Sequence, residues 1–458
     1  MEKRSSFSSS LGFVLAAAGS AVGLGNIWRF PYLAAKDGGG VFLAVYIVLA
    51  LTFGFTLIVS EVSIGRKTKQ SALTAYGKLD KRFSWIGFFS SLVPFMILPY
   101  YCIIGGWVLK YFTDFVTGHA ADTAQDGYFT TFIMGYTQPI VFDVIFLGFT
   151  AFVVFCGVNK GIESLSKILM PVLLIFVIAI AIFSLTLKGT GDRSGIDGLK
   201  FYVIPSISGK SMHDLFIVLL DAMGQLFYSI SVAMGIMVTY GSYFKDDENL
   251  MKSVNQIEFF DTLVAFLAGI MIIPAVYVFL GEEGMTAGPG LMFIALTKVF
   301  NQMGSVGAIV GAVFFFMVLL AALTSSISVL ETVVASLIDS FGWSRSKSTI
   351  IETITALVIS IIICLGYNIF YFEAPLPNGT SAQILDIMDY VSNNILMPVV
   401  AIGTCVLIGW IVKPKTVIEE ATKNGEKFGR KYVYIAMIKY ITPVLLFILL
   451  LGSFGIIK

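Results

Sequence analysis

The chain has 458 residues, of which 57% are hydrophobic and 13% are charged, and its formal net charge is +1. This composition predicts a polytopic membrane protein, because most of its surface must face lipid rather than water. The near-neutral charge leaves no basic stripe for nucleic acid. Four cysteines without paired spacing and two histidines in expected loops argue against a disulfide framework or a metal cluster.

Apolar segments of bilayer-spanning length, roughly 20 residues each, recur along almost the whole chain. We expect the first of them to be retained, since no small-residue cleavage site follows it. We expect no soluble domain between the segments. The eleven expected spans are residues 11–35, 41–65, 84–112, 140–157, 164–187, 214–243, 255–280, 303–338, 348–370, 383–411 and 433–456.

The basic residues set the expected orientation, because Lys and Arg are retained in short cytoplasmic loops. A cytoplasmic N-terminus places most of them inside, including the cluster from Lys413 to Lys431. An odd number of spans then leaves Lys458 outside. We therefore expect a multi-pass protein of the plasma membrane with its C-terminus extracellular.

Two spans are interrupted near their middles. The sequence GSAVGLGN breaks the first span at residues 19–26, and YSISVAMG breaks the sixth at residues 228–235. Hydrocarbon offers no hydrogen-bond partners, so unwound backbone is tolerated there only where it is buried or lines a polar site. Half-helix N-termini suit an anion, and unwound carbonyls suit a small cation. Close helix packing through small residues would also account for the glycines.

The two interrupted spans are five apart, which makes residues 11–187 and 214–411 two five-span units of opposite orientation. This pattern predicts an all-α inverted repeat in a single membrane domain that covers residues 1–458. The span at 433–456 lies outside the repeat. We expect the two broken helices to meet near the middle of the bilayer.

Several ordered motifs resemble those of the neurotransmitter:sodium symporters, the LeuT-like amino-acid and amine transporters. They are GSAVGLGNIWRFPY with GGGVFLAVY, YYCIIGGW at 100–107, TYGSY at 239–243, LAALTSSISVLE at 320–331 and LDIMDY at 385–390. The resemblance covers nearly the entire chain. It implies the LeuT-like fold and sodium-driven transport of a neutral, hydrophobic L-amino acid into the cytoplasm by alternating access.

The resemblance also implies two sodium sites. The first is expected at Ala21, Asn26, Ser229 and Asp261, completed by the carboxylate of the substrate. The second is expected at Gly19, Val22, Ala321, Thr324 and Ser325. For Thr324 and Ser325 the ordinary alternative is a hydroxyl that bonds back to a carbonyl of its own helix.

A substrate site beside the first sodium follows from the same resemblance. Its expected residues are Ser20, Ala21, Gly25, Ile97, Tyr101, Tyr228, Ser229, Ser231, Met234, Ser325 and Val329. Tyr101 would donate to the substrate carboxylate near Gly25, although taken alone it would be read as an interfacial tyrosine. Gly23 stands where monoamine transporters have an aspartate, so the substrate is expected to bring its own carboxylate.

Charges at membrane depth are functional candidates, and the resemblance places some of them in two gates. An outer gate is implied at Arg29, Asp389, Tyr101 and Tyr228. An inner gate is implied at Arg4, Ser242, Tyr243 and Asp339. We expect Glu61 to support the unwound backbone of the first or sixth span. Gln225 is expected to lie near the outer gate, and Asp221 is interpreted as structural.

The chain departs from the family pattern at several positions. Asp261 stands where many members have asparagine, and Ala265 one turn later carries no ionisable group. A fixed carboxylate would replace the chloride that some relatives use, so we expect chloride-independent transport. Asp261 is also a candidate to carry a proton on the return step. Tyr228 replaces a phenylalanine and Ala233 replaces a glycine. The twelfth span of many relatives is missing, which leaves both a monomer and a homodimer open.

The expected partners are therefore an amino acid, sodium ions and the bilayer, with no organic cofactor and no nucleic acid. A membrane-embedded enzyme would need a nucleophile with a base, or clustered metal ligands, in the spans. The sequence supplies neither, so we do not expect an enzyme. Two alternatives stay open, a non-transporting amino-acid sensor and a proton-coupled transporter of the same fold.

Overall fold

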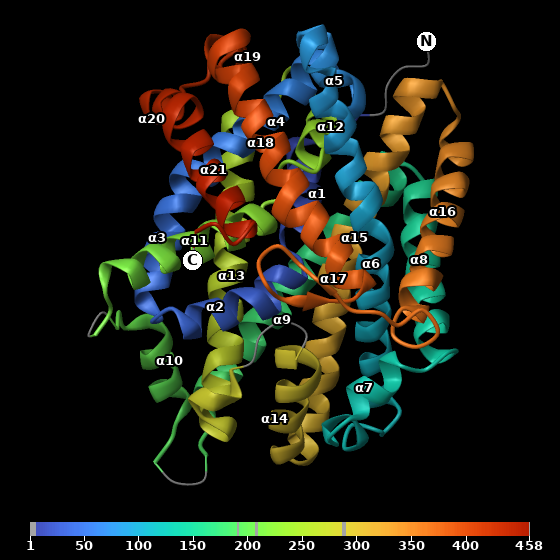
Figure 1. Cartoon of the computed structure of the whole chain (residues 1–458), viewed down its shortest axis with the longest axis vertical. Coiled ribbons are helices and arrows are strands. Elements are labelled where there is room, and N and C mark those ends of the chain that lie inside the picture. Colours follow the sequence, from blue (N-terminus) through green and yellow to red (C-terminus); the bar gives the residue numbers. More distant parts are fainter. Residues whose placement is uncertain (1–5, 190–191, 207–208, 286–289, 458) are drawn as a thin grey trace.

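A computed structural model of the chain describes residues 6–189, 192–206, 209–285 and 290–457. Figure 1 shows a bundle built almost entirely of helices. In the described part of the chain, nine helices are long and apolar enough to cross a membrane, and a bent pair at its start makes ten. The all-α membrane fold expected from the sequence is confirmed.

The N-terminal half of the chain contains the segments expected as the first five spans. Its long elements are α1 Ser10–Ala21, η1 Gly25–Arg29, α2 Phe30–Lys36, α3 Gly40–Leu49, η2 Ala50–Gly54, α4 Phe55–Thr68, α6 Ser84–Val116, α8 Gln138–Phe155, η5 Val158–Glu163 and α9 Ser164–Thr186. Its short connecting elements are α5 Ala72–Leu79, η3 Lys81–Phe83, η4 Asp122–Ala124 and α7 Tyr128–Ile133. The turns η1, η2 and η5 are π-helical, and η3 and η4 are 3₁₀ turns.

The C-terminal half contains the remaining spans. Its long elements are α11 Met212–Ser229, α12 Ile236–Tyr243, α13 Leu250–Leu280, α15 Ser305–Phe341, α16 Arg345–Leu365, α17 Ile384–Asp389, η8 Tyr390–Leu396, α18 Met397–Val406, η9 Leu407–Ile411, α20 Lys431–Ala436, η10 Met437–Ile441 and α21 Thr442–Ser453. Its connecting elements are α10 Gly195–Val203, η6 Glu282–Gly284, η7 Leu291–Ala295, α14 Leu296–Gln302, α19 Lys415–Ala421 and the antiparallel pair β1 Ala374–Pro375 with β2 Ser381–Ala382.

Local sequence signals explain where several of these helices begin and end. Ser211 and Asp214 form a capping box at the start of α11, which satisfies two backbone donors at once. Most span boundaries lie within four residues of those expected, and three differ by more, one of them the start of the seventh span at Leu250 rather than 255. The fifth span begins at Val158 rather than at 164, directly after Gly157 with its φ of 89°. The ninth ends at Leu365 rather than at 370, with Gly366 at its C-cap.

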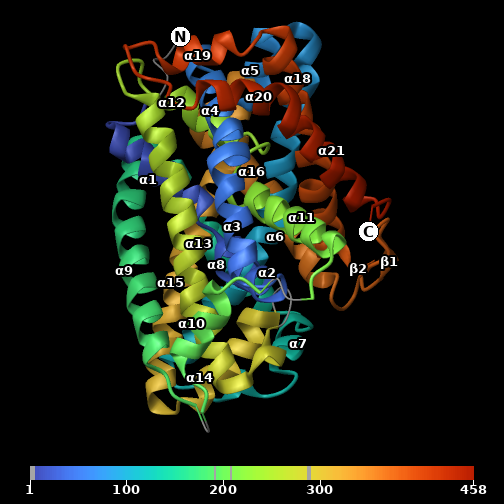
Figure 2. The ribbon, with the colours of Figure 1, turned by 90° about the vertical axis from the view of Figure 1, so that its left-hand side faces the viewer.

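The connecting helices separate into two groups at opposite ends of the bundle. Figures 1 and 2 show α5, α19 and α20 at one end and α7, α10 and α14 at the other. These are the segments that the expected topology places inside and outside, respectively. The long helix α15 runs between the two ends and packs against α1, α6, α9 and α16, so it forms the wall on which the broken helix α1 rests.

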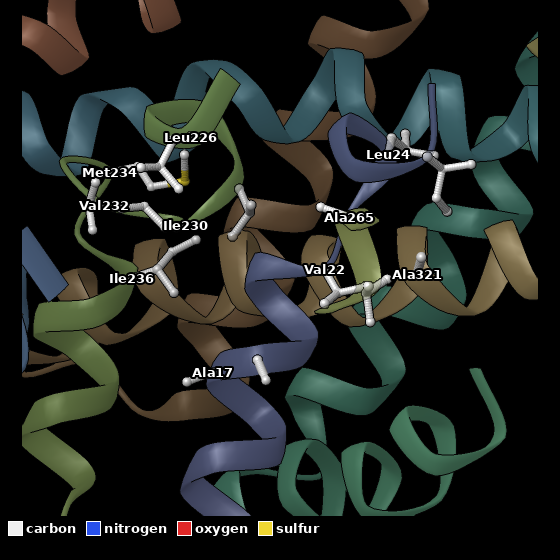
Figure 3. Close-up of a cluster of buried hydrophobic side chains, with 14 of the residues drawn as sticks. Ala17, Val22, Leu24, Leu226, Ile230, Val232, Met234, Ile236, Ala265 and Ala321 are labelled. Atoms are coloured by element: carbon white, nitrogen blue, oxygen red, sulfur yellow. The ribbon is translucent and has the colours of Figure 1, made fainter. Parts of the chain in front are cut away.

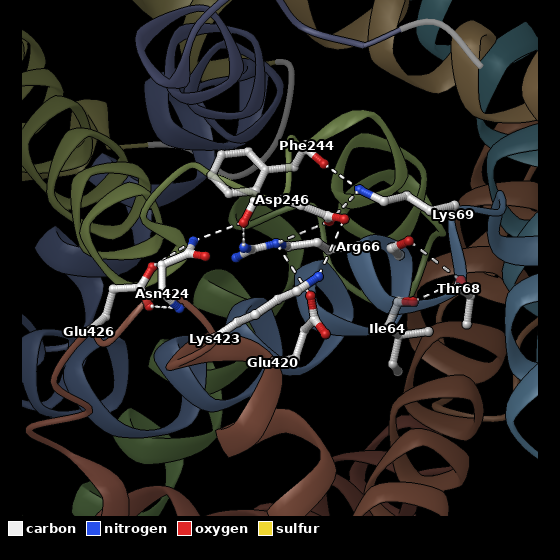
Figure 4. A network of polar contacts seen from close by, with 11 residues as sticks. Ile64, Arg66, Thr68, Lys69, Phe244, Asp246, Glu420, Lys423, Asn424 and Glu426 are labelled. Carbon is white, nitrogen blue, oxygen red and sulfur yellow. Dashed lines mark hydrogen bonds and ion pairs between the residues drawn. The ribbon is translucent and has the colours of Figure 1, made fainter. Parts of the chain in front are cut away.

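The end that carries α19 is held together by a buried arginine. The side chain of Arg66 on α4 is fully buried, and its Nη2 donates to the carbonyl of Asp246 at 2.5 Å. Its Nε lies 3.3 Å from the carboxylate of Glu420 on α19. Figure 4 shows this network, with Lys69 and Lys423 also converging on Asp246. The segment after α12 is thus tied to both α4 and α19.

Candidate functional site

The first broken span loses its helical winding between Ala21 and Gly25. Helix α1 ends at Ala21, and Val22 at its C-cap has a ψ of 89°, outside the helical range. The chain resumes as η1 and α2, and the two halves are bent by 56°. Such a break leaves backbone carbonyls without partners inside the helix. The hydroxyl of Ser325 on α15 donates to one of them, the Ser20 carbonyl, at 3.0 Å and lies 3.4 Å from the Gly19 carbonyl.

The second broken span is unwound between Ser229 and Ile236. Its backbone is strained, because Ser231 and Ala233 have positive φ angles of 54° and 61° although neither is glycine. Glu61 on α4 supports this segment, since its Oε1 accepts a hydrogen bond from the backbone N–H of Ala233 at 2.7 Å. Glu61 is fully buried. The sequence expected Glu61 beside an unwound segment, and this is where the structure places it.

The two breaks face each other across a small cavity. It offers ≈ 40 Å³ of space to the centre of a water molecule. Every residue expected to contact the substrate lines it, and so do Gly23, Leu24, Asn26 and Ile236. Figure 3 shows the apolar side chains of both breaks, with Val22 and Leu24 from the first and Ile230, Val232 and Met234 from the second. The structure therefore brings the expected substrate residues together at one place.

Gly23 lies close to two hydroxyl groups at this cavity, those of Ser325 and Tyr101. A Cβ at position 23 would lie 3.0 Å from Ser325 Oγ and 3.1 Å from Tyr101 Oη. A longer side chain would have to displace one of these groups. The Tyr101 hydroxyl is buried and has no hydrogen-bond partner among the described residues. It is therefore a donor available to a ligand.

Two of the residues expected at the first sodium site donate to the carboxylate of a third, Asp261. The Asn26 Nδ2 donates to Asp261 Oδ1 at 2.9 Å, and the Ser229 Oγ donates to the same oxygen at 2.6 Å. Asp261 is almost fully buried on α13. Ala21, the fourth residue, lines the adjoining cavity. The cluster links both breaks, because Asn26 belongs to the first and Ser229 to the second.

Sequence reasoning missed one member of this cluster. The Tyr46 hydroxyl on α3 donates to Asp261 Oδ2 at 3.3 Å, and Tyr46 is fully buried. Nothing near Tyr46 in the sequence distinguishes it from other aromatic residues of an apolar span. The cavity residue Ile236 was also missed, although its position directly after the second break is a signal that could have found it.

The residues expected at the second sodium site lie where α1 meets α15. A Cβ added to Gly19 would lie 3.2 Å from Thr324 Cβ, so these two residues are in direct contact. The Thr324 hydroxyl donates to the Ala321 carbonyl at 3.0 Å, which is the ordinary bond back to its own helix. A hydroxyl that donates in this way keeps its lone pairs for a cation. Val22 and Ser325 complete the group at the first break.

Of the four residues expected at the outer gate, Arg29 and Tyr228 line a second cavity of ≈ 250 Å³, whereas Asp389 and Tyr101 are not among its lining residues. The guanidinium of Arg29 lies 5.7 Å from the centre of the Tyr228 ring, and both residues line this space. No ion pair joins Arg29 to Asp389 in the described residues; Asp389 Oδ1 instead accepts a hydrogen bond from Asn393 at 2.6 Å. Gln225 donates to the Gly25 carbonyl at 3.1 Å.

Asp221, interpreted from the sequence as structural, lies next to Lys36. The two side chains form an ion pair of 2.6 Å, which links α11 to the end of α2. Lys36 is exposed, so the pair contributes little to stability. It does connect the outer halves of the two broken spans.

At the inner end, the expected pair of Arg4 and Asp339 cannot be followed, because Arg4 lies outside the described residues. Asp339 Oδ2 accepts a hydrogen bond from the backbone N–H of Ser71 at 2.6 Å. The Ser242 hydroxyl donates to the Thr239 carbonyl at 2.5 Å. The Tyr243 hydroxyl donates to Glu331 Oε1 at 2.7 Å.

An ion pair that sequence reasoning missed lies beside these residues. Arg345 at the start of α16 binds both carboxylate oxygens of the fully buried Glu331, at 2.6 and 2.9 Å. The sequence offers a signal here, because Glu331 is an ionisable residue within an apolar span and needs a partner. The missing information was which basic residue the fold brings to it.

The chain is similar to known transporters in sequence and in fold. The family profile described as sodium:neurotransmitter symporter family matches residues 4–131 and 135–458. An uncharacterised sodium-dependent transporter of Bacillus subtilis, YhdH, is 32% identical over 100% of this chain and 99% of its own length. The sodium- and chloride-dependent taurine transporter of Rattus norvegicus is 28% identical over 89% of this chain and 71% of its own. The crystal structure of MhsT in complex with L-phenylalanine superposes with a TM-score of 0.85 and 34% identity, covering 98% of this chain and 100% of that one.

Proposed function

We propose that this chain, which belongs to the sodium:neurotransmitter symporter family, carries a neutral, hydrophobic L-amino acid into the cytoplasm together with sodium and without chloride. The observation that carries the proposal is the cavity between the two breaks, which adjoins the Asp261 cluster. Unwound backbone and a buried carboxylate there provide oxygen ligands for a hard cation next to a space for a small molecule. We further propose that the N-terminus is cytoplasmic and the C-terminus extracellular in the plasma membrane.

The cavity walls support an amino acid with an apolar side chain. Ile97, Met234, Ile236 and Val329 line it, and no charged side chain is among its described lining residues. A charged substrate side chain would therefore be buried without a partner. Tyr101 supplies a donor for the substrate carboxylate. The L-phenylalanine bound by MhsT belongs to the same chemical class.

Chloride independence follows from the charge of Asp261. Relatives such as the taurine transporter are described as chloride-dependent. In this chain a carboxylate stands within hydrogen-bond distance of Asn26 and Ser229, both of them expected at the first sodium site. A fixed negative charge beside a sodium ion in a medium of low dielectric gives the attraction that a bound chloride would otherwise supply.

Coupling then takes the form of linkage between the ligands. Sodium at the first site would contact Asp261, Asn26 and the substrate carboxylate, so each ligand raises the affinity for the other. Sodium at the second site would replace the Ser325 hydroxyl as partner of the Gly19 carbonyl and would bind α1 to α15. We propose that loss of this second sodium releases α1 and opens the inner path.

The test is uptake of labelled amino acids into proteoliposomes with four external solutions, sodium or potassium combined with chloride or gluconate. We expect uptake in both sodium solutions and in neither potassium solution. Equal uptake in sodium and potassium would contradict sodium coupling and favour a proton-coupled transporter. Sodium-dependent binding without uptake would indicate a sensor, and uptake confined to sodium chloride would contradict chloride independence.

A further inference from the structure

We propose that Glu163, at the end of the π-helical turn η5, is a positioning residue that holds the start of α1 closed at the inner end. Its release would be the step that lets this half-helix move away from the bundle. The proposal rests on the proposed alternating access, and it assigns the inner closure to a residue outside the expected pair of Arg4 and Asp339. We call the interaction of Ser8 with Glu163 the Glu163 contact.

The Glu163 contact joins both carboxylate oxygens to one residue. The backbone N–H of Ser8 donates to Glu163 Oε2 at 2.7 Å, and the Ser8 hydroxyl donates to Oε1. Lys167, one turn further along α9, lies 2.7 Å from the same Oε1. The Ser8 carbonyl accepts from Lys245 at 2.7 Å. Glu163 is only 1% exposed, whereas Ser8 is exposed and the Lys167 side chain is 38% exposed, so a buried carboxylate receives these charge-assisted bonds from the surface of the bundle.

A glycine leaves the space that this carboxylate occupies. A Cβ added to Gly12 on α1 would lie 2.0 Å from Glu163 Oε1 and 2.4 Å from its carboxyl carbon. No side chain can stand at this position while Glu163 keeps its place. Alanine would otherwise favour a helix over glycine by up to about 1 kcal/mol, so glycine at this position of α1 is explained by the carboxylate rather than by the helix.

The residue next to Ser8 packs against α12. Phe7 is 1% exposed, and its ring centre lies 5.6 Å from that of Tyr240 and 6.2 Å from that of Tyr243 on α12. Its backbone N–H donates to the Tyr243 carbonyl at 3.1 Å. If Ser8 leaves Glu163, then Phe7 must move with it. The Glu163 contact therefore holds an aromatic cap over α12.

The same helix connects this contact to the second sodium site. Helix α1 begins two residues after Ser8 and carries Gly19 near its other end, roughly 15 Å away at 1.5 Å per residue. Sodium would hold the far end of α1, and Glu163 holds its start. Lys167 lies on the helix that Glu163 begins, so opening would leave the carboxylate with a cation rather than alone. This makes the contact reversible.

The test measures how accessible α12 is from the cytoplasmic side. In a Cys156→Ser background, which removes the exposed native cysteine, Tyr240→Cys places a thiol beneath Phe7. Inside-out vesicles in sodium are treated with a membrane-impermeant thiol reagent. Glu163→Gln removes the charge, and Gly12→Ala displaces the carboxylate without altering it. We expect both to increase the labelling rate about tenfold, the factor that corresponds to weakening one charge-assisted bond.

Gly148→Ala is the matched control, because Gly148 lies within α8 with no atom near its would-be Cβ. It should leave the labelling rate unchanged. Helix propensity alone predicts that Gly12→Ala also leaves the labelling rate unchanged or lowers it. An increase in the labelling rate therefore distinguishes the Glu163 contact from helix propensity. Unchanged labelling in Gly12→Ala would overturn the proposal even if Glu163→Gln failed to fold.

The labelling assay requires no transport, which separates this proposal from the proposed function. If both variants were labelled faster but uptake did not depend on sodium, the Glu163 contact would be supported and sodium coupling would be contradicted. If uptake depended on sodium but Gly12→Ala left the labelling rate unchanged, sodium coupling would be supported and the Glu163 contact would be contradicted.

Discussion

The two breaks that face each other across the cavity are stabilised in different ways. The first is supported by neutral groups, the Ser325 hydroxyl on the Ser20 carbonyl and the Gln225 amide on the Gly25 carbonyl, at 3.0 and 3.1 Å. The second has positive φ angles at Ser231 and Ala233 and is held by the buried carboxylate of Glu61.

This difference indicates different roles for the two segments. A hydroxyl that donates to a carbonyl is easily replaced by a cation, because both satisfy the same oxygen. A carboxylate that accepts from a buried N–H cannot be replaced by a cation without leaving that donor unpaired. The first break therefore exchanges partners during the proposed transport cycle, whereas the second is a rigid frame. Substitutions at each break should separate these roles.

The largest effect is expected from Glu61→Ala. It leaves the Ala233 N–H buried without an acceptor and removes the support of a strained segment, at a cost of about 3 kcal/mol. We expect substrate binding to be lost and the melting temperature in detergent to fall. Glu352→Ala is the control, because Glu352 is also buried in a span but its Oε1 has no partner among the described residues. Equal losses of substrate binding and of melting temperature in both variants would contradict the role of the second break as a rigid frame.

Asp261→Asn tests the carboxylate that joins the two breaks. Asparagine keeps the size of the side chain and removes its charge, so the sodium concentration for half-maximal uptake should rise at least about tenfold in chloride-free medium. Chloride should restore part of the loss. Asp143→Asn is the control, since Asp143 is buried on α8 and accepts from Ser360 at 2.6 Å, away from both breaks. Full activity of Asp261→Asn without chloride would refute the proposed replacement of chloride.

A smaller effect is expected from Ser325→Ala at the first break. The substitution removes one hydroxyl from the proposed second sodium site, which should weaken sodium binding about tenfold while the fold stays intact. Ser336→Ala removes a hydroxyl from the same helix, where it donates to the Thr332 carbonyl at 2.8 Å. Isothermal titration with sodium compares the two. If Ser325→Ala lost as much stability as Glu61→Ala, both breaks would be rigid frames, and the first would not exchange partners.

The sequence was sufficient to locate both breaks, because an apolar span rarely accommodates glycine together with polar residues unless its backbone is unwound beside a polar site. The sequence was not sufficient to identify the hydrogen-bond and ion-pair partners that come together only when the helices pack. Tyr46 reaches Asp261 from a span with no polar signal, and Arg345 reaches Glu331 only once α15 and α16 are paired. Glu163 was placed in a loop because the expected fifth span began one residue later, whereas the structure starts that span at Val158.

Local turn chemistry carries a further signal, between the ninth and tenth spans. Residues 374–382 contain Asn378 followed by Gly379, a pair typical of hairpin turns, and the structure has β1 and β2 on either side of it. The expected topology treated this stretch only as a connection. Short elements of this kind do not affect the span count, but the loop places Asn378 at the edge of the outer cavity.

The smallest expected effect, Ala233→Gly, tests whether the second break stores strain. Alanine at a φ of 61° is disfavoured by about 1 kcal/mol relative to glycine, whereas glycine gains flexibility when unfolded, so the two effects nearly cancel. We expect a change in melting temperature within about 2 °C and unchanged sodium dependence. Lys413→Gly, at a φ of 69° in the linker after η9, provides the control outside the bundle. If Ala233→Gly abolished uptake while Lys413→Gly did not, the methyl group of Ala233 rather than the Glu61 bond would be what defines the frame.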